Sequence, residues 1–336
     1  MKNEKKELLR LLGFCAVILV LTLALNALLK PKWSEGYGSG TVIRGFYKMP
    51  KDSVDVLILG SSNVICGVDA NTMLEEYGIS AYSCGTEAQP MFGSYAWLCE
   101  GMRRQSIKAV VLDMGSIFDR YDEPGYRKVF DYMRPSALKL RLLAEYKRDI
   151  APDADISSYI LPLILYHSRF SELTREDISF RRDSLRGFYP RSEIRNKDFD
   201  GIGTETSAEC KEIPEADLAS FYKLAEKCRE RDIPLIHISC ASVKFTAEKH
   251  NAVKKLADEN GLVFLDFNET DKWPEIDYAD DMADFEHFNL FGAKKVTRVI
   301  SDTLLELVSL PDRSGDTGAQ AHNRAAYAVE GNGGTK

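Results

Sequence analysis

Two short motifs in this chain contain residue types that can transfer an acyl group. The first, Gly60-Ser61-Ser62-Asn63, follows a short apolar run. A serine at a tight turn between a strand and a helix exposes its hydroxyl at the sheet edge, and its backbone N–H can stabilise an oxyanion there. Ser62 is therefore a candidate nucleophile. The alternatives are a plain turn of small residues and a phosphate-binding turn.

The second motif, Asp284-Phe285-Glu286-His287-Phe288-Asn289, lies just before the last predicted helix. Asp284 and His287 are close enough in the chain to meet at one turn. The carboxylate can then fix the tautomer of the His287 ring, whose other nitrogen accepts the proton of the serine. A solvated acidic loop is the alternative, because further aspartates crowd this stretch. The position before the terminal helix favours the catalytic interpretation.

Short apolar runs that end in small or polar residues alternate with helical patterns along the chain. Continuous apolar runs are typical of parallel strands buried on both faces. The predicted strands are 54–59, 79–84, 107–112, 234–238 and 262–265. The predicted helices are 69–77 with Asp69 as its cap, 92–104, 215–231, 246–260 and 290–307. This alternation predicts a mainly parallel sheet of about five strands with helices on both faces and a site at the carboxyl ends of the strands.

Three stretches fall outside this alternation. Residues 30–51 are rich in glycine and predict a spacer with one short strand around Thr41 and Val42. Residues 118–213 contain helical patterns at 135–149 and 156–173, and we expect an insertion that covers or flanks the site, within a domain spanning 52–310. Residues 311–336 contain few large apolar side chains, so we expect a disordered tail.

The N-terminal region contains an uncharged, apolar run from Leu11 to Leu29, interrupted only by Thr22 and Asn26. A run of this length can span a bilayer. Because the tail 1–10 is short and the folded part follows the run, we expect a signal anchor at 11–29, with a cytoplasmic tail and a single-pass protein whose domain is extracytoplasmic. A cleaved signal peptide is the alternative, although no clean A-x-A site follows the run.

Composition excludes some functional classes. The formal net charge is −7, without the basic stripe of a nucleic-acid binder. The seven cysteines show no C-x-x-C spacing, which argues against a zinc or redox motif.

The two motifs together resemble the SGNH (GDSL-like) hydrolase superfamily, whose nucleophile follows the first strand in a G-D-S motif and whose D-x-x-H motif precedes the last helix. The resemblance implies that Ser62 is the nucleophile, that Ser61 replaces the aspartate, and that His287 and Asp284 complete the triad. It also implies that Gly85, after the second strand, donates its N–H to the oxyanion. The implied fold is a three-layer α/β/α, flavodoxin-like domain that needs no metal or organic cofactor. The resemblance covers about 54–308 without the insertion.

The chain departs from that family after the third predicted strand. The family has an asparagine there that completes the oxyanion hole, whereas this strand ends in Asp113-Met114-Gly115-Ser116. The third donor is then absent, or is supplied by Asn63, Gln89 or the insertion.

The G-S-S motif and the single N-terminal span also resemble a narrower group, the bacterial envelope acyl-transfer proteins of teichoic-acid D-alanylation and polysaccharide O-acetylation. This resemblance implies an extracytoplasmic serine esterase or acyltransferase acting on acyl esters of envelope glycan, beside a membrane-bound O-acyltransferase. His167 and Arg169 in the insertion are candidate substrate-binding residues. The alternative, favoured by the missing asparagine, is a non-catalytic protein that binds envelope glycan or acts as a scaffold for the acyltransferase.

Overall fold

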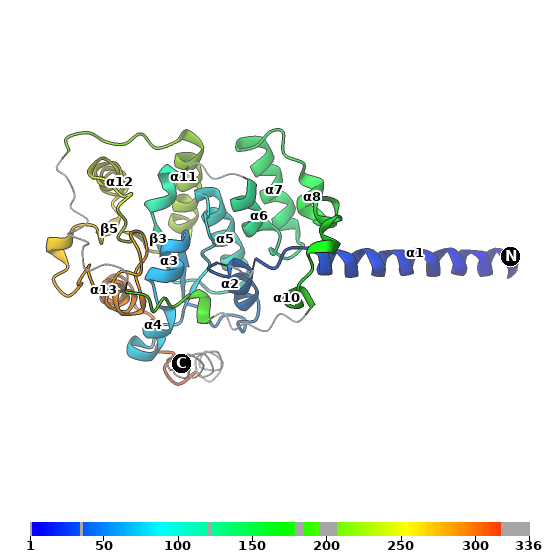
Figure 1. Cartoon of the computed structure of the whole chain (residues 1–336), viewed down its shortest axis with the longest axis horizontal. Helices are drawn as coiled ribbons and strands as arrows, with labels where there is room; N and C mark the ends of the chain where they lie inside the picture. The colour runs from blue at the N-terminus through cyan, green and yellow to red at the C-terminus, as the bar shows by residue number, and fades with distance from the viewer. Residues whose placement is uncertain (1, 34–35, 120–122, 179–184, 195–206, 317–336) are drawn as a thin grey trace. The chain divides into compact units, whose positions relative to one another are not determined.

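The computed structural model describes residues 2–33, 36–119, 123–178, 185–194 and 207–316 (Figure 1). The chain divides into two compact units. We call Met1–Lys32 with Arg134–Arg182 the helical unit, and Trp33–Met133 with Asp183–Lys336 the sheet unit. The predicted insertion is therefore shared between the two units.

The sheet unit is built on five parallel strands in the order β2-β1-β3-β4-β5. The strands are β1 Val56–Leu59, β2 Ala81–Ser83, β3 Ala109–Asp113, β4 Leu235–Ser239 and β5 Val263–Asp266. Every residue of the first four strands is buried, as expected for parallel strands covered on both faces. The prediction of a flavodoxin-like parallel α/β sheet is confirmed.

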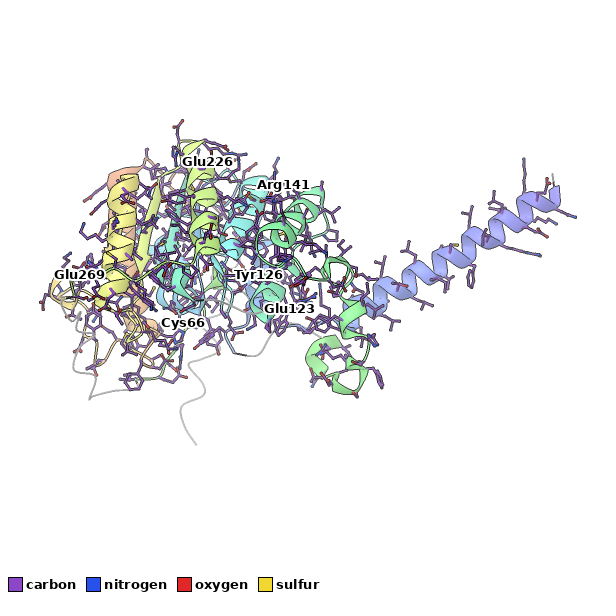
Figure 2. The ribbon with its side chains drawn as sticks, turned by 90° about the horizontal axis from the view of Figure 1, so that it is seen from above. Cys66, Glu123, Tyr126, Arg141, Glu226 and Glu269 are labelled. Atoms are coloured by element: carbon purple, nitrogen blue, oxygen red, sulfur yellow. The ribbon has the colours of Figure 1, made fainter. Side chains whose placement is uncertain are left out.

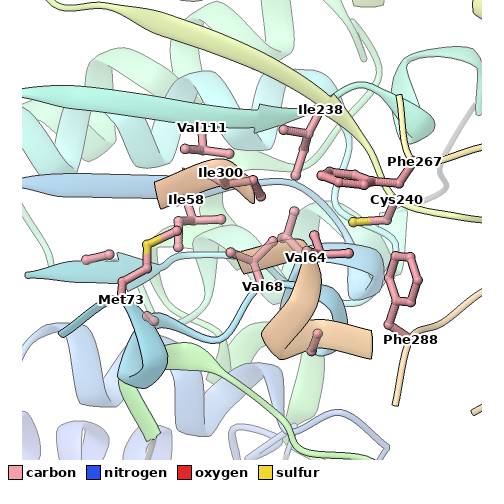
Figure 3. Close-up of a cluster of buried hydrophobic side chains, with 14 of the residues drawn as sticks. Ile58, Val64, Val68, Met73, Val111, Ile238, Cys240, Phe267, Phe288 and Ile300 are labelled. Atoms are coloured by element: carbon pink, nitrogen blue, oxygen red, sulfur yellow. The ribbon is translucent and has the colours of Figure 1, made fainter. Parts of the chain in front are cut away.

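Helices cover both faces of this sheet and make it the middle of three layers. On one face, α3 Ser62–Gly67 and α4 Ala70–Tyr77 pack against α13 Leu290–Leu307. The core between these helices and the sheet contains Ile58, Val111, Ile238, Val64, Val68, Met73, Phe288 and Ile300 (Figure 3). On the other face, Leu57 of β1 lies against Gly101 of α5 Met91–Arg104. On the same face, α11 Glu215–Arg229 packs beside α5, and its Phe221 ring lies 5.2 Å from the His237 ring of β4. The helix α12 Ala247–Asn260 contacts β5.

Local sequence signals determine where the site helices begin and end. Asp69 accepts a hydrogen bond from the Asn71 N–H at 2.9 Å, which confirms it as the cap of α4. The Asn289 side chain accepts from the Phe291 and Gly292 N–H groups at 3.0 and 3.1 Å and starts α13 where the sequence predicts it. Gly60 has a φ of 151°, and a Cβ there would lie 2.7 Å from Cβ of Asp113. Only glycine allows the turn after β1 to pass so close to β3.

The spacer prediction for 30–51 is wrong in its local structure. Residues Ser39–Phe46 form a helix, α2, in place of the predicted short strand. Its apolar residues Val42, Ile43 and Phe46 recur at helical spacing and are buried. The Val42 carbonyl accepts a hydrogen bond from the Tyr82 hydroxyl at 2.6 Å, which joins α2 to β2.

The tail prediction needs a smaller correction, because its first residues are described and have fixed partners. Arg313 donates to both oxygens of the buried Asp55 carboxylate at 2.9 and 3.0 Å, and its N–H bonds to the Gly78 carbonyl. Residues 317–336 lie outside the described part of the chain, so the prediction of disorder there is untested.

The remaining elements of the sheet unit are short: α6 Glu123–Phe130 and the 3-10 turns η1 Gly115–Phe118, η3 Leu185–Gly187 and η4 Thr270–Lys272. The helical unit contains α1 Lys2–Leu29, α7 Ala137–Asp149, α8 Ile156–Ile160, α9 Leu163–Tyr166, η2 Arg169–Glu172 and α10 Arg175–Ile178. The helix predicted over 156–173 is thus three short helices. Leu161 leaves helical geometry (φ −123°, ψ 85°) because the residue before Pro162 is disfavoured in the helical region.

The helix α1 has a charged first part and is apolar from Leu11 to Leu29, and the side chains of its most apolar window are not buried against other parts of the chain. Figure 2 shows these side chains pointing outward around the helix. A helix of this length and composition can cross a membrane, either as an anchor or as a signal sequence.

Candidate active site

The three predicted triad residues meet at the carboxyl end of β1. Ser62 is the first residue of α3, and its Oγ lies 2.9 Å from Nε2 of His287. Nδ1 of the same ring lies 2.9 and 3.1 Å from the two carboxylate oxygens of Asp284. These distances suit a nucleophile, a general base and an orienting carboxylate. The three side chains are thus in hydrogen-bond contact, and their catalytic role stays a prediction.

The Asp284 carboxylate is held by more than the histidine. Oδ1 accepts from the backbone N–H groups of Glu286 and His287 at 2.8 and 2.9 Å, and Nη1 of Arg191 donates to Oδ2. Partial burial alone raises the pKa of the Asp284 carboxyl. The hydrogen bonds from His287, Glu286 and Arg191 outweigh that effect and hold the pKa well below its usual value. Asp284 therefore stays ionised beside His287 in moderately acidic solution.

Tyr37 lies beside Nδ1 of His287, the ring nitrogen that contacts Asp284. Its hydroxyl lies 3.4 Å from Nδ1 of His287 and 3.3 Å from Nη1 of Arg191, and the two rings have centroids 5.0 Å apart. The Tyr37 backbone N–H donates to Oε1 of Glu87 at 2.8 Å, which fixes the position of the tyrosine backbone. Burial, with the nearby Cys66, raises the pKa of Tyr37 to about 12, so the hydroxyl keeps its proton and can donate it in a hydrogen bond.

Sequence reasoning missed both Arg191 and Tyr37. Arg191 reaches Asp284 because its segment is attached at two places: the Tyr189 N–H donates to the Ile65 carbonyl, and the Arg191 carbonyl accepts from the Leu290 N–H. The only sequence signal for the tyrosine is its place in Gly36-Tyr37-Gly38, an aromatic residue between two glycines in an otherwise polar stretch.

The predicted oxyanion donors lie in different surroundings. A Cβ on Gly85 would stand 2.9 Å from side-chain atoms of Val64 and Ile65, so this glycine lies directly against the start of α3. Within the described residues, neither the Ser62 N–H nor the Gly85 N–H bonds to a protein group. The Asn63 amide is similarly without a protein partner among these residues, and Asn63 lines the cavity beside Ser62.

The Gln89 amide, in contrast, is used within the fold. Its Nε2 donates to Ser94 at 3.0 Å, and its Oε1 accepts from the Thr86 hydroxyl at 3.0 Å. The side chain is fully buried. Of the two side chains predicted as a third oxyanion donor, Asn63 is the one that lines the cavity and has no hydrogen bond to the described residues.

A cavity of about 450 Å³ opens beside the nucleophile. Two cationic and two anionic side chains lie on its wall, including the pair Lys244 and Glu286 at 2.7 Å. The lining residues are Ser61, Ser62, Asn63, Ala88, Gly115, Ser116, Asp119, Cys240, Ser242, Lys244, Phe245, Lys249 and Glu286. Pockets of this volume accept small organic ligands and sugar-sized groups.

Asp113 is the last residue of β3, the strand after which the resembled family has its asparagine. Its Oδ1 accepts from the Cys240 N–H at 3.3 Å, whereas its Oδ2 has no hydrogen-bond partner within the described residues. Burial raises the pKa of Asp113 to about 7, against the hydrogen bonds from Cys240 and Gly115, which lower it. A carboxyl group here cannot replace an amide donor unless it is protonated.

His167 and Arg169 belong to the helical unit, and both make their polar contacts inside it. Arg169 pairs with Asp177 at 2.9 Å, and Nδ1 of His167 lies 3.0 Å from the Ile164 carbonyl. Their role in substrate binding stays a prediction.

Within the described residues, one group of side chains has the donor set of a metal site. Ligand atoms of His250, Asp266 and Glu269 lie within 4.8 Å of one another at the end of β5. Each already has a protein partner, because His250 bonds to Asp266 at 2.6 Å and Glu269 pairs with Lys272 at 2.7 Å. A cation would have to displace these contacts.

The fold and the site define an α/β protein with a five-stranded parallel sheet and a serine, a histidine and an aspartate in hydrogen-bond contact at its carboxyl edge. Comparison of the chain with protein-family models and with curated proteins gave no match.

Proposed function

We propose that this chain is a serine esterase or acyltransferase of the SGNH type, which works through an acyl-enzyme on Ser62. The observation that carries the proposal is the hydrogen-bonded series from the Ser62 hydroxyl through His287 to Asp284. The order of the motifs along the chain and the parallel sheet agree with the same class. The open cavity beside Ser62 provides room for an ester.

In the proposed reaction, Nε2 of His287 takes the hydroxyl proton as Oγ of Ser62 attacks an ester carbonyl. The N–H groups of Ser62 and Gly85, with the Asn63 amide, stabilise the oxyanion. The intermediate collapses, and the leaving alcohol takes the proton from His287. Water or a sugar hydroxyl then attacks the acyl-enzyme with His287 as the base, and the second collapse returns the proton to Ser62. Neither step needs a metal or an organic cofactor.

The substrate we propose is an acyl ester of a cell-envelope glycan, with a membrane-bound O-acyltransferase as the partner that exports the acyl group. The support is the resemblance of the G-S-S motif and the N-terminal span to envelope acyl-transfer proteins. A scaffold or glycan-binding protein without catalysis is the second candidate. The lack of an asparagine after the third strand favours it.

Labelling with a fluorophosphonate probe tests the proposal directly, because such probes react preferentially with an activated serine. We expect the full-length protein in detergent to gain one adduct on Ser62, seen by intact mass and peptide mapping. The absence of any adduct from fluorophosphonates and activated esters alike would leave the non-catalytic candidate.

Transfer to a glycan should compete with hydrolysis. After reaction with a small activated ester, we expect the acyl group on Ser62 to be lost faster in the presence of envelope glycan than in buffer alone. The cavity beside Ser62 can seat a sugar acceptor, and a positioned hydroxyl reacts faster than bulk water. Intact-protein mass against time is the measurement, with an unrelated neutral polysaccharide as the control. Equal loss in all three conditions would leave a plain esterase.

We also propose that α1 is a retained anchor with the sheet unit on the extracytoplasmic side. The support is that the end of α1 is part of the folded helical unit. Nζ of Lys32 donates to the carbonyls of Ala27 and Leu28 and caps the helix. Arg169 donates to the Leu29 carbonyl at 3.0 Å. Cleavage after the apolar run would remove these contacts.

The anchor leads to a prediction on whole cells. The full-length protein should stay in the membrane fraction after alkaline carbonate extraction, and protease added to spheroplasts should digest the sheet unit. A cytoplasmic protein of the same cells, intact throughout, is the control. Release by carbonate would support a cleaved signal, and protection from protease would reverse the topology.

A further inference from the structure

Large apolar side chains are exposed on the short helices of the helical unit. They are Ile160, Ile164 and Leu165 at 50, 46 and 45% exposure, and Phe170 and Ile178 at 71 and 78%. We call these five residues the collar. They come from α8, α9, η2 and α10, and Figure 1 shows α8 and α10 gathered about the C-terminal end of α1. Exposed apolar groups concentrated at one place mark a binding surface.

Hydrogen bonds attach the collar helices to the last turn of α1. The Asn26 side chain accepts from the Leu163 N–H at 2.8 Å, and Nη1 of Arg169 donates to the Leu29 carbonyl at 3.0 Å. Nη2 of Arg169 also binds both oxygens of Asp177, at 2.9 and 3.0 Å. One arginine therefore joins α1, η2 and α10. These bonds fix the position of the collar along the axis of α1.

If the apolar part of α1 spans the bilayer as proposed, its length sets the depth of the collar. The run from Leu11 to Leu29 is about 28 Å long at 1.5 Å per residue, close to the roughly 30 Å of a hydrocarbon core. Leu29 then lies at the boundary of the core, and Asn26 lies about one turn inside it. A polar side chain at that depth needs a partner within the protein, and Leu163 is that partner. The start of α9 is thereby held at the boundary between acyl chains and headgroups.

We propose that the collar inserts into the lipid surface around the end of α1, so that the helical unit lies partly in the membrane. The inference rests on the proposed anchor. It adds to the single transmembrane span a second contact, in which the short helices lie in the membrane interface. Lipid is the occupant we favour, because any side chain exposed at this height meets lipid unless another protein displaces it. Short helices with exposed aliphatic and aromatic side chains are suited to this layer.

Tryptophan fluorescence in vesicles tests the depth of the collar with the full-length protein. The vesicles contain phosphatidylcholine and phosphatidylglycerol with bromine either near the headgroup or near the chain ends. Ile164→Trp, Phe170→Trp and Ile178→Trp each add one reporter to the three native tryptophans, and quenching is read as the difference from the unsubstituted protein. Leu19→Trp on α1 reports the span, and Leu305→Trp, which is 48% exposed on α13, is the matched control.

We expect the collar tryptophans to be quenched by the shallow bromines and little by the deep ones, with strong deep quenching at position 19 and none at 305. Quenching at position 19 without quenching at the collar would overturn the inference and leave the anchor standing. The inference would also be overturned if the collar tryptophans become protected from solvent only when a membrane acyltransferase is reconstituted with the protein, because the collar would then bind a protein and not lipid. No quenching at position 19 would remove the anchor and the collar together, whereas fluorophosphonate labelling of Ser62 tests catalysis independently.

Discussion

Replacing Ser62 with alanine should abolish acyl turnover and fluorophosphonate labelling while the protein stays folded. Oγ is the only heavy atom lost, it contacts Nε2 of His287, and Ser62 is half-buried at the start of α3. Removal of the nucleophile or the base of a serine triad typically costs about 10⁴- to 10⁶-fold in kcat. His287→Ala should have a similar effect. The measurement is kcat/KM for a small activated ester, with circular dichroism as the check on folding.

Ser61→Ala is the matched control for this result. Ser61 precedes the nucleophile in the same turn and makes no side-chain capping bond to α3. Its replacement should change the rate little. If Ser61→Ala abolishes turnover and Ser62→Ala does not, the nucleophile is misplaced by one residue. Asp284→Asn should do less harm than His287→Ala, because Asp284 orients the ring and does not itself accept the serine proton.

Asn63→Ala should lower kcat/KM by about 10²- to 10³-fold, the usual cost of losing one oxyanion donor. The amide lines the cavity next to Ser62 and has no protein partner within the described residues, so its loss removes a donor without breaking a contact of the fold. The melting temperature should therefore change little. Initial rates with the same activated ester and a thermal melt measure the two effects.

Gln89→Ala provides the contrast, because Gln89 is the other side chain predicted as a donor. Its amide bonds to Thr86 and Ser94 inside the fold, so truncation should lower the free energy of unfolding by about 1–3 kcal/mol. The rate per folded molecule should stay within a few-fold of the unsubstituted protein. A rate collapse in Gln89→Ala with no change in Asn63→Ala would show that the third donor has been assigned to the wrong residue.

Arg191 gives this site a feature that a simple triad lacks. A guanidinium bonded to Asp284 keeps the carboxylate charged and fixed, and it also offsets part of the negative charge next to His287. Tyr37 adds a hydroxyl on the same side of the ring. Both residues have polar contacts with the Asp284–His287 pair, and within the described part of the chain neither hydrogen-bonds to Ser62. We interpret them as positioning residues for the Asp284–His287 pair.

Much of the fold follows from local sequence patterns. The strands were predicted because continuous apolar runs with helices between them are the pattern of parallel strands buried on both faces. The bounds of α13 matched the prediction because Asn289 is a capping residue directly before an amphipathic run. The site motifs could be placed together for a related reason: the carboxyl ends of parallel strands share one edge of the sheet. Whether those motifs catalyse acyl transfer stays a prediction.

The residues that surround the triad were decided by tertiary structure. Tyr37 and His287 are separated by 250 positions, and Arg191 and Asp284 by 93, so no local periodicity connects them. The helix α2 was missed because it is short and contains two glycines, and its apolar side chains are buried by segments far along the chain, with Phe46 packed against the rings of Tyr82 and Trp97. Tyr37 and Arg191 each lie in a stretch that reads as a polar loop in the sequence. Their contacts with the triad therefore appear only when distant segments pack together. Local pattern determined the strands and the order of the motifs, whereas packing between distant segments decided which side chains hold Asp284 and His287 in place.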